Sequence, residues 1–479
     1  MEAKLNRRKV LALAVGGGAA VAAGQMFPAP AEAKKLAPAY AIPDGPVTAD
    51  EFRALRTMAS EVFAKNRVTV AEGTFHMPSC DKYRSMFAWD SGWHAIGMTR
   101  IDPALAASEI EIVLKQQVEE TGRVPHEVKF PQLQAPPDML SKLGGKLGAS
   151  QWDAQGRTAM IAPPSFMISA EKIFALTGDT NWLARVLPRL ERCAHYLTHD
   201  RDLFGDGLVS VVHPWETGTD SSPAYDKIVG LHFGTPLGAP RRGLLYPRML
   251  KFNAEVGWDP QALKQRNRFV LEDLCFNAIT IRGLLSIAAL QEAAGSAEKA
   301  RKFRDQAQAM TDALDRINWV EAKGCYFSRY DVKSPKLAMR TTCASLLPLL
   351  TGLISKERAA RLVKEHLLNP AEFWQPFVVS FNPKDELDRE RVYMEDLLLW
   401  RGHCIWTNMN WMMNEGLLSY GYREEARELT RRTARMIQHE GLREFYDFRN
   451  GQGKGATNFN WPAVVLDMIA RSWPEVVTG

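Results

Sequence analysis

Apolar residues recur at helical spacing along most of the chain. In the segment 48–66, one face of the predicted helix carries Phe52, Leu55, Met58, Ala59 and Phe63, a spacing that fits the 3.6-residue turn. Thr48 stands before this run and Glu51 follows three residues later, the pattern of a capping box. The pattern therefore predicts a helix that begins directly after Thr48.

A second helix is predicted from Asp102, which can cap it, with Pro103 in its first turn. Similar periodicity occurs in 163–177, 181–198, 270–294, 296–318, 336–352, 356–367, 403–419, 422–438 and 459–473. Strand-like alternation is scarce, and its best example is "LVSVV" at 208–212. About twelve helices in pairs predict an all-α toroid of two concentric rings, in which loops at one end build a pocket.

The first 33 residues have the features of a targeting segment. Arg7 and Arg8 precede a short apolar run, and "AEA" at Ala31 to Ala33 fits a signal-peptidase site. We expect a twin-arginine-type signal over 1–33, export to the periplasm or the medium, and one catalytic domain over 34–479. No later segment offers about 18 continuous apolar residues, so no membrane association is expected after removal of the signal.

Charge and cysteine content narrow the classes of partner and cofactor. The net charge of +5 is dispersed, without a block of Lys or Arg, which argues against nucleic acid. Six cysteines lack C-x-x-C spacing, so no zinc or redox site is predicted. We expect no cofactor; a structural calcium ion would rest on analogy alone, because no EF-hand loop is present.

Four stretches between the helices combine aromatic rings with acidic or basic side chains. The chain has 13 tryptophans, and the four stretches contain Trp89, Asp90 and Trp93; Trp215, Glu216 and Asp220; Trp400, Arg401, Trp406 and Trp411; and Glu444, Tyr446, Asp447 and Trp461. The connections around them, 71–92, 121–160, 199–269, 370–400 and 440–457, are predicted as long loops, which are usually functional. Aromatic faces beside carboxylates suit a sugar, which presents C–H faces and hydroxyls. The clusters therefore predict a carbohydrate ligand.

Cleavage of a glycoside requires one carboxylic acid and one carboxylate. Asp220 and Glu444 are candidates from different loops, and Glu216, Asp90 and Asp447 are alternatives. Spacing along the chain does not choose among them, because distant loops meet only in the fold.

At these residues the chain resembles glycoside hydrolase family 63, an (α/α)6-barrel group with members acting on mannosylglycerate and glucosylglycerate. The likeness covers roughly residues 50–475. "HPWETGTDSSPAYD" is similar to the family stretch whose Asp is the general acid, here Asp220, and "LREFYD" to the stretch whose Glu is the general base, here Glu444. "FAWDSGWHAIGM" matches the segment that holds the nonreducing sugar, and "QQVEETGRVPHEV" resembles the Gln-rich helix end that follows, with Gln116.

The resemblance implies an inverting hydrolase of an α-linked glucoside or mannoside, such as a glycosylglycerate or a small oligosaccharide. It implies that Trp89 and Asp90 hold the nonreducing sugar. The full set of predicted sugar-binding residues is Trp89, Asp90, Trp93, Gln116, Trp215, Glu216, Trp400, Arg401, Trp406 and Trp461. Two further readings stay open: another sugar-active enzyme on the same scaffold, such as an epimerase or a polysaccharide lyase using His or Tyr, and a binding protein without chemistry. No metal ligands are predicted, and His94, His126 and His213 are interpreted as structural.

Several features depart from the family pattern or lie outside it. Thr217 and Ser221 replace the frequent Ser and Asn, and "WRG" is followed by His403 and Cys404 instead of proline. The long connection 226–269 is interpreted as a lid, a substrate-specific wall or a contact between subunits of a homo-oligomer. The Gly-rich stretch "GQGKGATN" is expected to let the backbone run close to the sugar.

Overall fold

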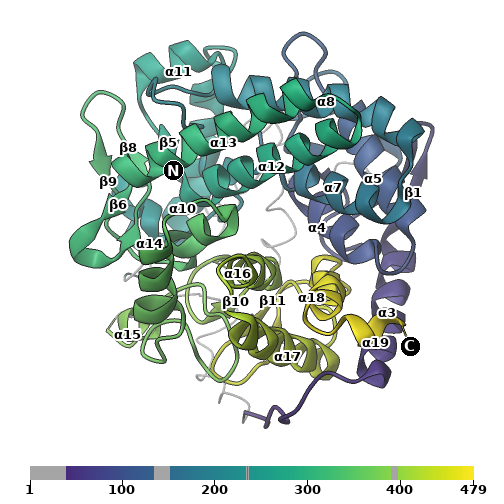
Figure 1. Ribbon diagram of the computed structural model, residues 1–479. Coiled ribbons are helices and arrows are strands. Elements are labelled where there is room, and N and C mark those ends of the chain that lie inside the picture. The colour runs from purple at the N-terminus through teal and green to yellow at the C-terminus, as the bar shows by residue number, and fades with distance from the viewer. Residues whose placement is uncertain (1–38, 134–150, 233–234, 236, 390–397, 479) are drawn as a thin grey trace, which may run out of the picture.

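The computed structural model of the protein describes residues 39–133, 151–232, 235, 237–389 and 398–478 (Figure 1). The predicted signal segment 1–33 lies outside the described residues, so export stays a prediction.

Six helices form a closed inner ring, each in contact with the next and the last in contact with the first (Figure 1). In order around the ring they are α4 (Ala88–Met98), α7 (Ser165–Thr177), α12 (Leu274–Ala293), the 3-10 helix η6 (Cys343–Thr351), α16 (Thr407–Ser419) and α18 (Val464–Ser472). The outer helices beside them are α3 (Ala49–Asn66), α5 (Pro103–Lys115), α8 (Thr180–His199), α13 (Ala297–Ile317), α14 (Lys356–Arg361) and α17 (Arg423–Glu440). The predicted arrangement of two concentric rings is confirmed.

The distribution of apolar residues in each helix explains whether it lies in the inner or the outer ring. Helix α12 is apolar on nearly every side, and a helix of this kind must be buried all round. It is long and apolar enough to cross a membrane, but 83% of its apolar window is buried inside the protein. Helix α13 beside it reads "AEKARKFRDQAQAMTDALDRI" and buries one face only. The outer ring therefore separates the inner ring from solvent.

Caps predicted from the sequence are present at two outer helices. Thr48 and Glu51 form a complete capping box at the start of α3. The Asp102 side chain accepts hydrogen bonds from two backbone N–H groups at the start of α5, with Pro103 in the first turn. These caps satisfy N–H groups that a helix leaves unpaired at its first turn.

Two glycines allow α4 to lie tightly within the inner ring. A Cβ atom on Gly92 would lie 2.5 Å from the backbone of Phe166 in α7, and one on Gly97 would lie 2.6 Å from the backbone of Ala463. Neither position has room for a side chain. The spacing in "WDSGWHAIGM" therefore lets α4 contact both neighbours closely.

The inner ring closes through one buried carboxylate. Asp467 in α18 accepts hydrogen bonds from Lys172 in α7 at 2.8 Å, from Arg100 directly after α4 at 2.8 Å, and from the Trp411 indole in α16 at 3.0 Å. Burial opposes ionisation, yet the two cations lower the pKa of Asp467 well below its usual range. Four segments from both ends of the chain thus share one charge.

Short strands join the ends of helices and give the loops their shape. They pair as β1 (Arg67–Val70) with β2 (Gly73–His76), β3 (Met86–Phe87) with β4 (Glu127–Val128), β5 (Leu271–Glu272) with β8 (Arg329–Tyr330) and β9 (Lys336–Leu337), β6 (Trp319–Val320) with β7 (Cys325–Tyr326), and β10 (Cys404–Ile405) with β11 (Phe445–Asp447) and β12 (Gly453–Lys454). All of these pairs are antiparallel. The fold is mostly helical, and the strands occupy its connections.

Further helices complete the described chain. They are η1 (Pro131–Leu133), η3 (Pro214–Glu216), η4 (Pro223–Tyr225), α9 (Asp226–Val229), α10 (Gly238–Ala254), α11 (Pro260–Arg266), η5 (Glu321–Lys323), the π-helical η7 (Leu362–Leu367), α15 (Lys384–Leu387), η9 (Trp461–Ala463) and α19 (Pro474–Thr478).

Three sequence-based expectations about elements are wrong. The loop predicted over 71–92 contains β2 and β3 and the start of α4, and the loop over 199–269 contains α10 and α11. Proline and glycine obscured α10: Pro240 stands in its first turn, where proline is tolerated, but Pro247 lies inside the helix. The predicted strand 208–212 forms only an isolated bridge from Val211 to Leu271, because that neighbouring segment offers so short a partner.

Candidate active site

Three carboxylates from distant parts of the chain act on one another. Asp90 lies in the first turn of α4, Asp220 follows η3, and Glu444 directly precedes β11. The charge of Glu444 contributes to raising the pKa of both Asp90 and Asp220, after the larger effect of burial. The same burial and charges raise the pKa of Tyr83 well above its usual value, so its hydroxyl keeps its proton. The fold thus brings together the acidic residues that three separate motifs contain.

Glu444 is surrounded by hydrogen-bond donors. Its Oε1 accepts from the Tyr83 hydroxyl at 2.5 Å, and its Oε2 accepts from Lys82 Nζ at 3.0 Å and from the backbone N–H of Ala456 at 2.7 Å. The side chain is 2% exposed. These three donors hold the carboxylate in one orientation. Each oxygen has two acceptor sites, so Oε1 retains one for a water molecule.

The chain around Glu444 is held from several sides. Its backbone N–H donates to Ala456 O at 3.0 Å, and its carbonyl accepts from the Trp461 indole at 2.9 Å. A Cβ atom on Gly455 would lie 2.5 Å from Glu444 Oε2, and Gly455 has a φ of 69°, which favours glycine. The Gly-rich stretch therefore brings the backbone against the Glu444 carboxylate itself.

Asp220 has a contrasting environment. Among the residues that the structure describes, no other side chain hydrogen-bonds its carboxyl group, and the residue is only partly buried. Its backbone carbonyl accepts from the Tyr246 hydroxyl of α10 at 2.9 Å. Burial is the main cause that raises the pKa of Asp220 to about 6, with Glu444 adding to it and the positive charge of Arg242 opposing it. This carboxyl group can carry a proton near neutral pH.

Glu216 anchors the loop that carries Asp220. Its buried side chain pairs with Arg201 at 2.5 Å and accepts from the backbone N–H groups of Ile161 at 3.1 Å and Val212 at 2.6 Å. His213 uses both ring nitrogens, since Nδ1 accepts from Trp215 N and Nε2 donates to Tyr246 O. The first half of "HPWETGTDSSP" is thus a buried support for the second half.

Asp90 is 7% exposed and stands above a second buried carboxylate. Next to it, Ser91 donates to Glu109 Oε1 at 2.6 Å, and Glu109 Oε2 also accepts from the backbone and the ring of His76. Burial opposes the charge of Glu109, but the hydrogen-bonded ring of His76 and the His94 ring, whose Nδ1 lies 3.5 Å away, lower its pKa to about 2. The charge of Glu109 adds to the causes that raise the pKa of Asp90 well above its usual value.

Asp447, the remaining alternative candidate for a catalytic carboxylate, is engaged by basic side chains near it in the chain. Arg449 binds it through Nε at 2.9 Å and through a second guanidinium nitrogen at 2.5 Å, and Lys454 lies 3.6 Å away. Its position in β11 is also fixed by pairing with Cys404.

The predicted aromatic residues divide into a layer at the site and a layer behind it. Trp89 lies against Gly218 of the Asp220 loop, where a Cβ atom would come within 3.2 Å of the indole, and Trp215 is half-buried beside Tyr246. Trp461 bonds the Glu444 carbonyl, and Trp400 stacks on Trp406 at 3.8 Å between ring centroids. Side chains without exposed surface are those of Trp93, Trp406 and Trp411.

Two predicted polar residues have their contacts elsewhere. Arg401 is paired with Asp226. Gln116 is the partly exposed C-cap of α5, and none of its contacts involves the three carboxylates.

Sequence reasoning missed four residues that contact the site. Lys82 and Tyr83 come from the polar run "CDKYRS" before α4, and Arg242 and Tyr246 come from α10 within the connection 226–269. Arg242 lies 5.1 Å from the Tyr246 ring centroid, and its buried Nε has no hydrogen-bond partner. The sequence offered one indication of their role, namely their position: Lys82 and Tyr83 precede the motif of Asp90, and Arg242 and Tyr246 follow that of Asp220.

The described residues contain no group of three or more His, Cys, Asp or Glu side chains arranged to hold a metal ion. All six cysteines fall within the described ranges, and Cys80, Cys193, Cys275, Cys325 and Cys343 are free thiols.

Comparison with known proteins gives consistent matches over most of the chain. Residues 83–462 match the family model described as the mannosylglycerate hydrolase MGH1-like glycoside hydrolase domain. The chain is 28% identical over 431 residues to a mannosylglycerate hydrolase of Thermus thermophilus, covering 85% of this chain and 98% of the relative. It is 23% identical to a glucosylglycerate hydrolase of Mycolicibacterium hassiacum, over 81% of this chain and 92% of the relative.

The fold comparison agrees. A crystal structure of the family 63 mannosylglycerate hydrolase from Thermus thermophilus, in complex with Tris and D-glycerate, superimposes with a TM-score of 0.72 at 26% identity. The match covers 86% of this chain and 99% of that chain. Because the family model spans most of the sequence and the ring of helices matches throughout, the protein belongs to the MGH1-like glycoside hydrolase family and is a family 63-type hydrolase with an (α/α)6 fold.

Proposed function

We propose that the protein hydrolyses an α-linked glucoside or mannoside with inversion, with Asp220 as general acid and Glu444 as general base. The observation that carries the proposal is the unequal environment of the two carboxyl groups. Asp220 has a raised pKa and no side-chain donor among the described residues, whereas Glu444 accepts three hydrogen bonds. Environments that differ in this way suit an acid and a base in one site.

In the proposed reaction, protonated Asp220 donates to the glycosidic oxygen as the bond to the anomeric carbon breaks. Glu444 uses the free acceptor site of Oε1 to remove a proton from water, which attacks the opposite face of the sugar. Tyr83 and Lys82 keep the Glu444 carboxylate in place while it does so. The scheme requires no organic cofactor.

We further propose that Asp90 and Trp89 hold the nonreducing sugar. Asp90 is close enough to both catalytic carboxylates for their charges to raise its pKa, and Trp89 lies against the Asp220 loop. A carboxyl group that binds two sugar hydroxyls and an indole that packs on the C–H face are the usual elements of such a subsite. The other predicted sugar-binding residues pack behind the site or hold its loops, and their geometry gives less support for direct contact with the sugar.

We propose that Arg242 binds a negatively charged aglycone. Glycerate, which occurs in the substrates for which the relatives are named, is such a group. It has no ion-pair partner in the part of the chain that the structure describes, and its charge acts on Asp220. A guanidinium group pairs well with a carboxylate. We therefore propose mannosylglycerate or glucosylglycerate as the substrate, and, from residues 1–33, hydrolysis outside the cytoplasm.

The rival chemistry that relies on histidine has less support. Burial lowers the pKa of His213 to about 3 and of His126 to about 4. Both rings therefore stay neutral at physiological pH and are poor proton donors. A binding protein without chemistry would bind these glycosides and be stabilised by them without turnover.

Two substitutions separate the roles of the catalytic pair. Asp220→Asn should be nearly inactive on the glycosylglycerate but recover on the matching α-glycosyl fluoride, since fluoride leaves with little need of a proton. Glu444→Gln should stay poor on both, and each loss should be about 10²–10⁴-fold. Steady-state kinetics with both substrates measures this; equal loss of Asp220→Asn on both, or recovery of Glu444→Gln, would contradict the assignment.

Arg242→Gln tests the aglycone. It should lower kcat/KM for the glycosylglycerate by about 10–100-fold, the size of one lost charge-assisted bond, and leave the glycerol conjugate within about threefold. Because Arg242 lowers the pKa of Asp220, its removal should also move the alkaline limb of the rate profile to higher pH. Arg241→Gln, at an exposed neighbouring site on α10, is the matched control. Equal losses on the charged and uncharged substrates would exclude this role.

Asp90→Asn and Glu216→Gln remove the same charge and should change stability in opposite directions. The raised pKa of Asp90 means that the fold disfavours its ionised form, so Asp90→Asn should raise the unfolding temperature increasingly as pH rises above about 4. Its kcat/KM should nevertheless fall by about 10-fold or more. Glu216→Gln leaves buried Arg201 without a counter-charge, which costs about 3–5 kcal/mol. Calorimetry at several pH values is the measurement, and destabilisation by Asp90→Asn would contradict the account.

A further inference from the structure

The direction of the Asp220 carboxyl group depends on the loop that carries it. No other described side chain hydrogen-bonds this carboxyl group, so its backbone alone aims it. Tyr246 holds the carbonyl of Asp220 from α10. A second connection begins at Thr219, the residue immediately before Asp220, and reaches the inner ring.

Tyr225 forms that connection. Its hydroxyl lies 2.6 Å from Thr219 Oγ1 and donates to Asp273 Oδ2 at 2.8 Å. The phenol has one proton and gives it to Asp273, so the 2.6 Å contact requires the Thr219 hydroxyl as donor; Thr217 Oγ1, at 3.4 Å, is its more distant alternative acceptor. All three side chains are at most 2% exposed. Burial and the charge of Asp273 raise the pKa of Tyr225 well above its usual value, and burial raises the pKa of Asp273 to about 6. Above that pH the phenol is therefore the donor and Asp273 the acceptor.

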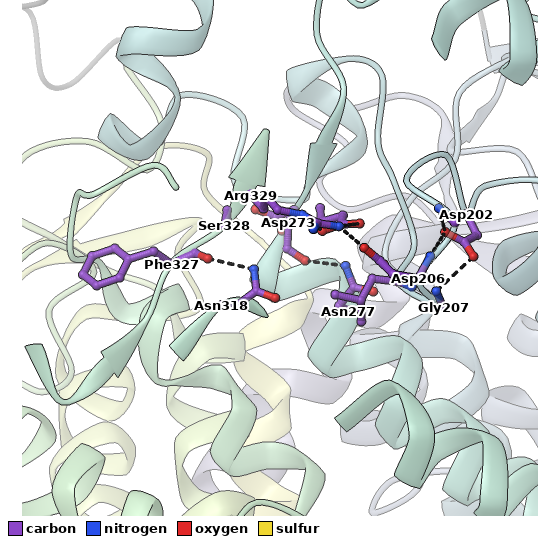
Figure 2. Close-up of polar contacts among 12 residues, drawn as sticks. Asp202, Asp206, Gly207, Asp273, Asn277, Asn318, Phe327, Ser328 and Arg329 are labelled. Atoms are coloured by element: carbon purple, nitrogen blue, oxygen red, sulfur yellow. Dashed lines mark hydrogen bonds and ion pairs between the residues drawn. The ribbon is translucent and has the colours of Figure 1, made fainter. Parts of the chain in front are cut away.

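Asp273 is a fixed point because it also begins the inner helix α12. Its Oδ1 accepts from the backbone N–H of Phe276 at 2.9 Å, which makes Asp273 the N-cap of α12. Figure 2 shows Asn277, one turn later, donating to the Asp273 carbonyl at 2.9 Å. Asn277 also bonds Val209 through both its amide nitrogen and its oxygen, and Val209 leads into the Asp220 loop.

The strand before α12 is held in the same region. Arg329 binds both oxygens of Glu272, the residue before Asp273, at 2.7 and 2.8 Å, and also pairs with Asp206 (Figure 2). Leu271 and Val211 exchange two backbone hydrogen bonds across this segment. The start of α12 therefore holds the Asp220 loop at two points: through Val209 and Val211 before the loop, and through Tyr225 at Thr219.

We propose that Tyr225 and Asp273 are positioning residues for the general acid, tying Thr219 to the N-cap of α12 and so aiming Asp220 at the glycosidic oxygen. This inference rests on the proposed role of Asp220. Loss of the Thr219–Tyr225–Asp273 connection should impair only the step in which Asp220 gives up its proton, whereas a purely structural defect would impair the reaction of every substrate.

The chain offers a matched control. Tyr326 is a fully buried tyrosine whose hydroxyl donates to Asp315, at the end of the outer helix α13. Tyr225→Phe and Tyr326→Phe each remove one buried hydroxyl from an aspartate, and only the first of these lies next to the Asp220 loop.

The experiment compares two substrates that differ in their need for an acid. On mannosylglycerate or glucosylglycerate, whichever the wild type cleaves, Tyr225→Phe should lower kcat about 10-fold, part of the range for general acid catalysis. On the matching α-glycosyl fluoride it should stay within about twofold. Tyr326→Phe should leave the ratio of the two rates unchanged, even where both variants lose similar thermal stability.

Thr219→Val, which removes the hydroxyl from the other end of the tie, provides a second variant if Tyr225→Phe does not fold. It should show the same selective loss, and the double variant should lose little more than either single one, because both break one connection. Equal loss on both substrates, no loss on either, or additive losses would overturn the proposal.

Asp220→Asn in the same series separates this inference from the one on which it rests. If Asp220→Asn recovers on the fluoride and Tyr225→Phe shows no selectivity, the positioning role is wrong and the acid assignment stands. If Asp220→Asn does not recover on the fluoride, the proposed function itself fails.

Discussion

The whole arrangement depends on closure of the inner ring, and closure depends on the buried carboxylate of Asp467. Asp90 is on the first inner helix, and Glu444 precedes the last. They meet because α18 returns to α4 and α7, where Arg100 and Lys172 surround Asp467. A buried charge with several partners is stable only when all of them are in place. The interaction that closes the ring is thus separate from the candidate catalytic carboxylates that it brings together.

Once the ring is closed, the site contains more negative charge than an apolar interior favours. The fold resolves this by giving each carboxyl group different neighbours. Glu444 receives a cation, a phenol and a backbone N–H, while Asp220 receives no side-chain donor from the described residues and Asp90 stands over the charge of Glu109. Burial, with a smaller contribution from neighbouring negative charges, raises the pKa of both Asp90 and Asp220. These different neighbours are the basis of the acid and base roles that we propose for Asp220 and Glu444.

Local signals in the sequence predicted the local features. Thr48 with Glu51, Asp102 with Pro103 and the periodic apolar faces predicted the outer helices and their caps, because these interactions lie within one turn. The start of α4 was not predicted, since the polar run before it reads as a turn. The partners of the carboxylates were also missed: Lys82 and Glu444 are 362 positions apart, and no spacing rule connects such residues. Motif resemblance identified Asp220 and Glu444, but only the fold shows how differently they are surrounded.

The measurement that tests the central claim most directly is the anomeric form of the first product. If Asp220 protonates the leaving oxygen while Glu444 activates water on the opposite face, an α-linked substrate must release the β-anomer of the sugar. Proton NMR during the first minutes of hydrolysis distinguishes the anomers before they interconvert. Early appearance of the β-anomer is the result that the account predicts. Initial release of the α-anomer would mean net retention and would contradict the role of Glu444 as a base acting through water.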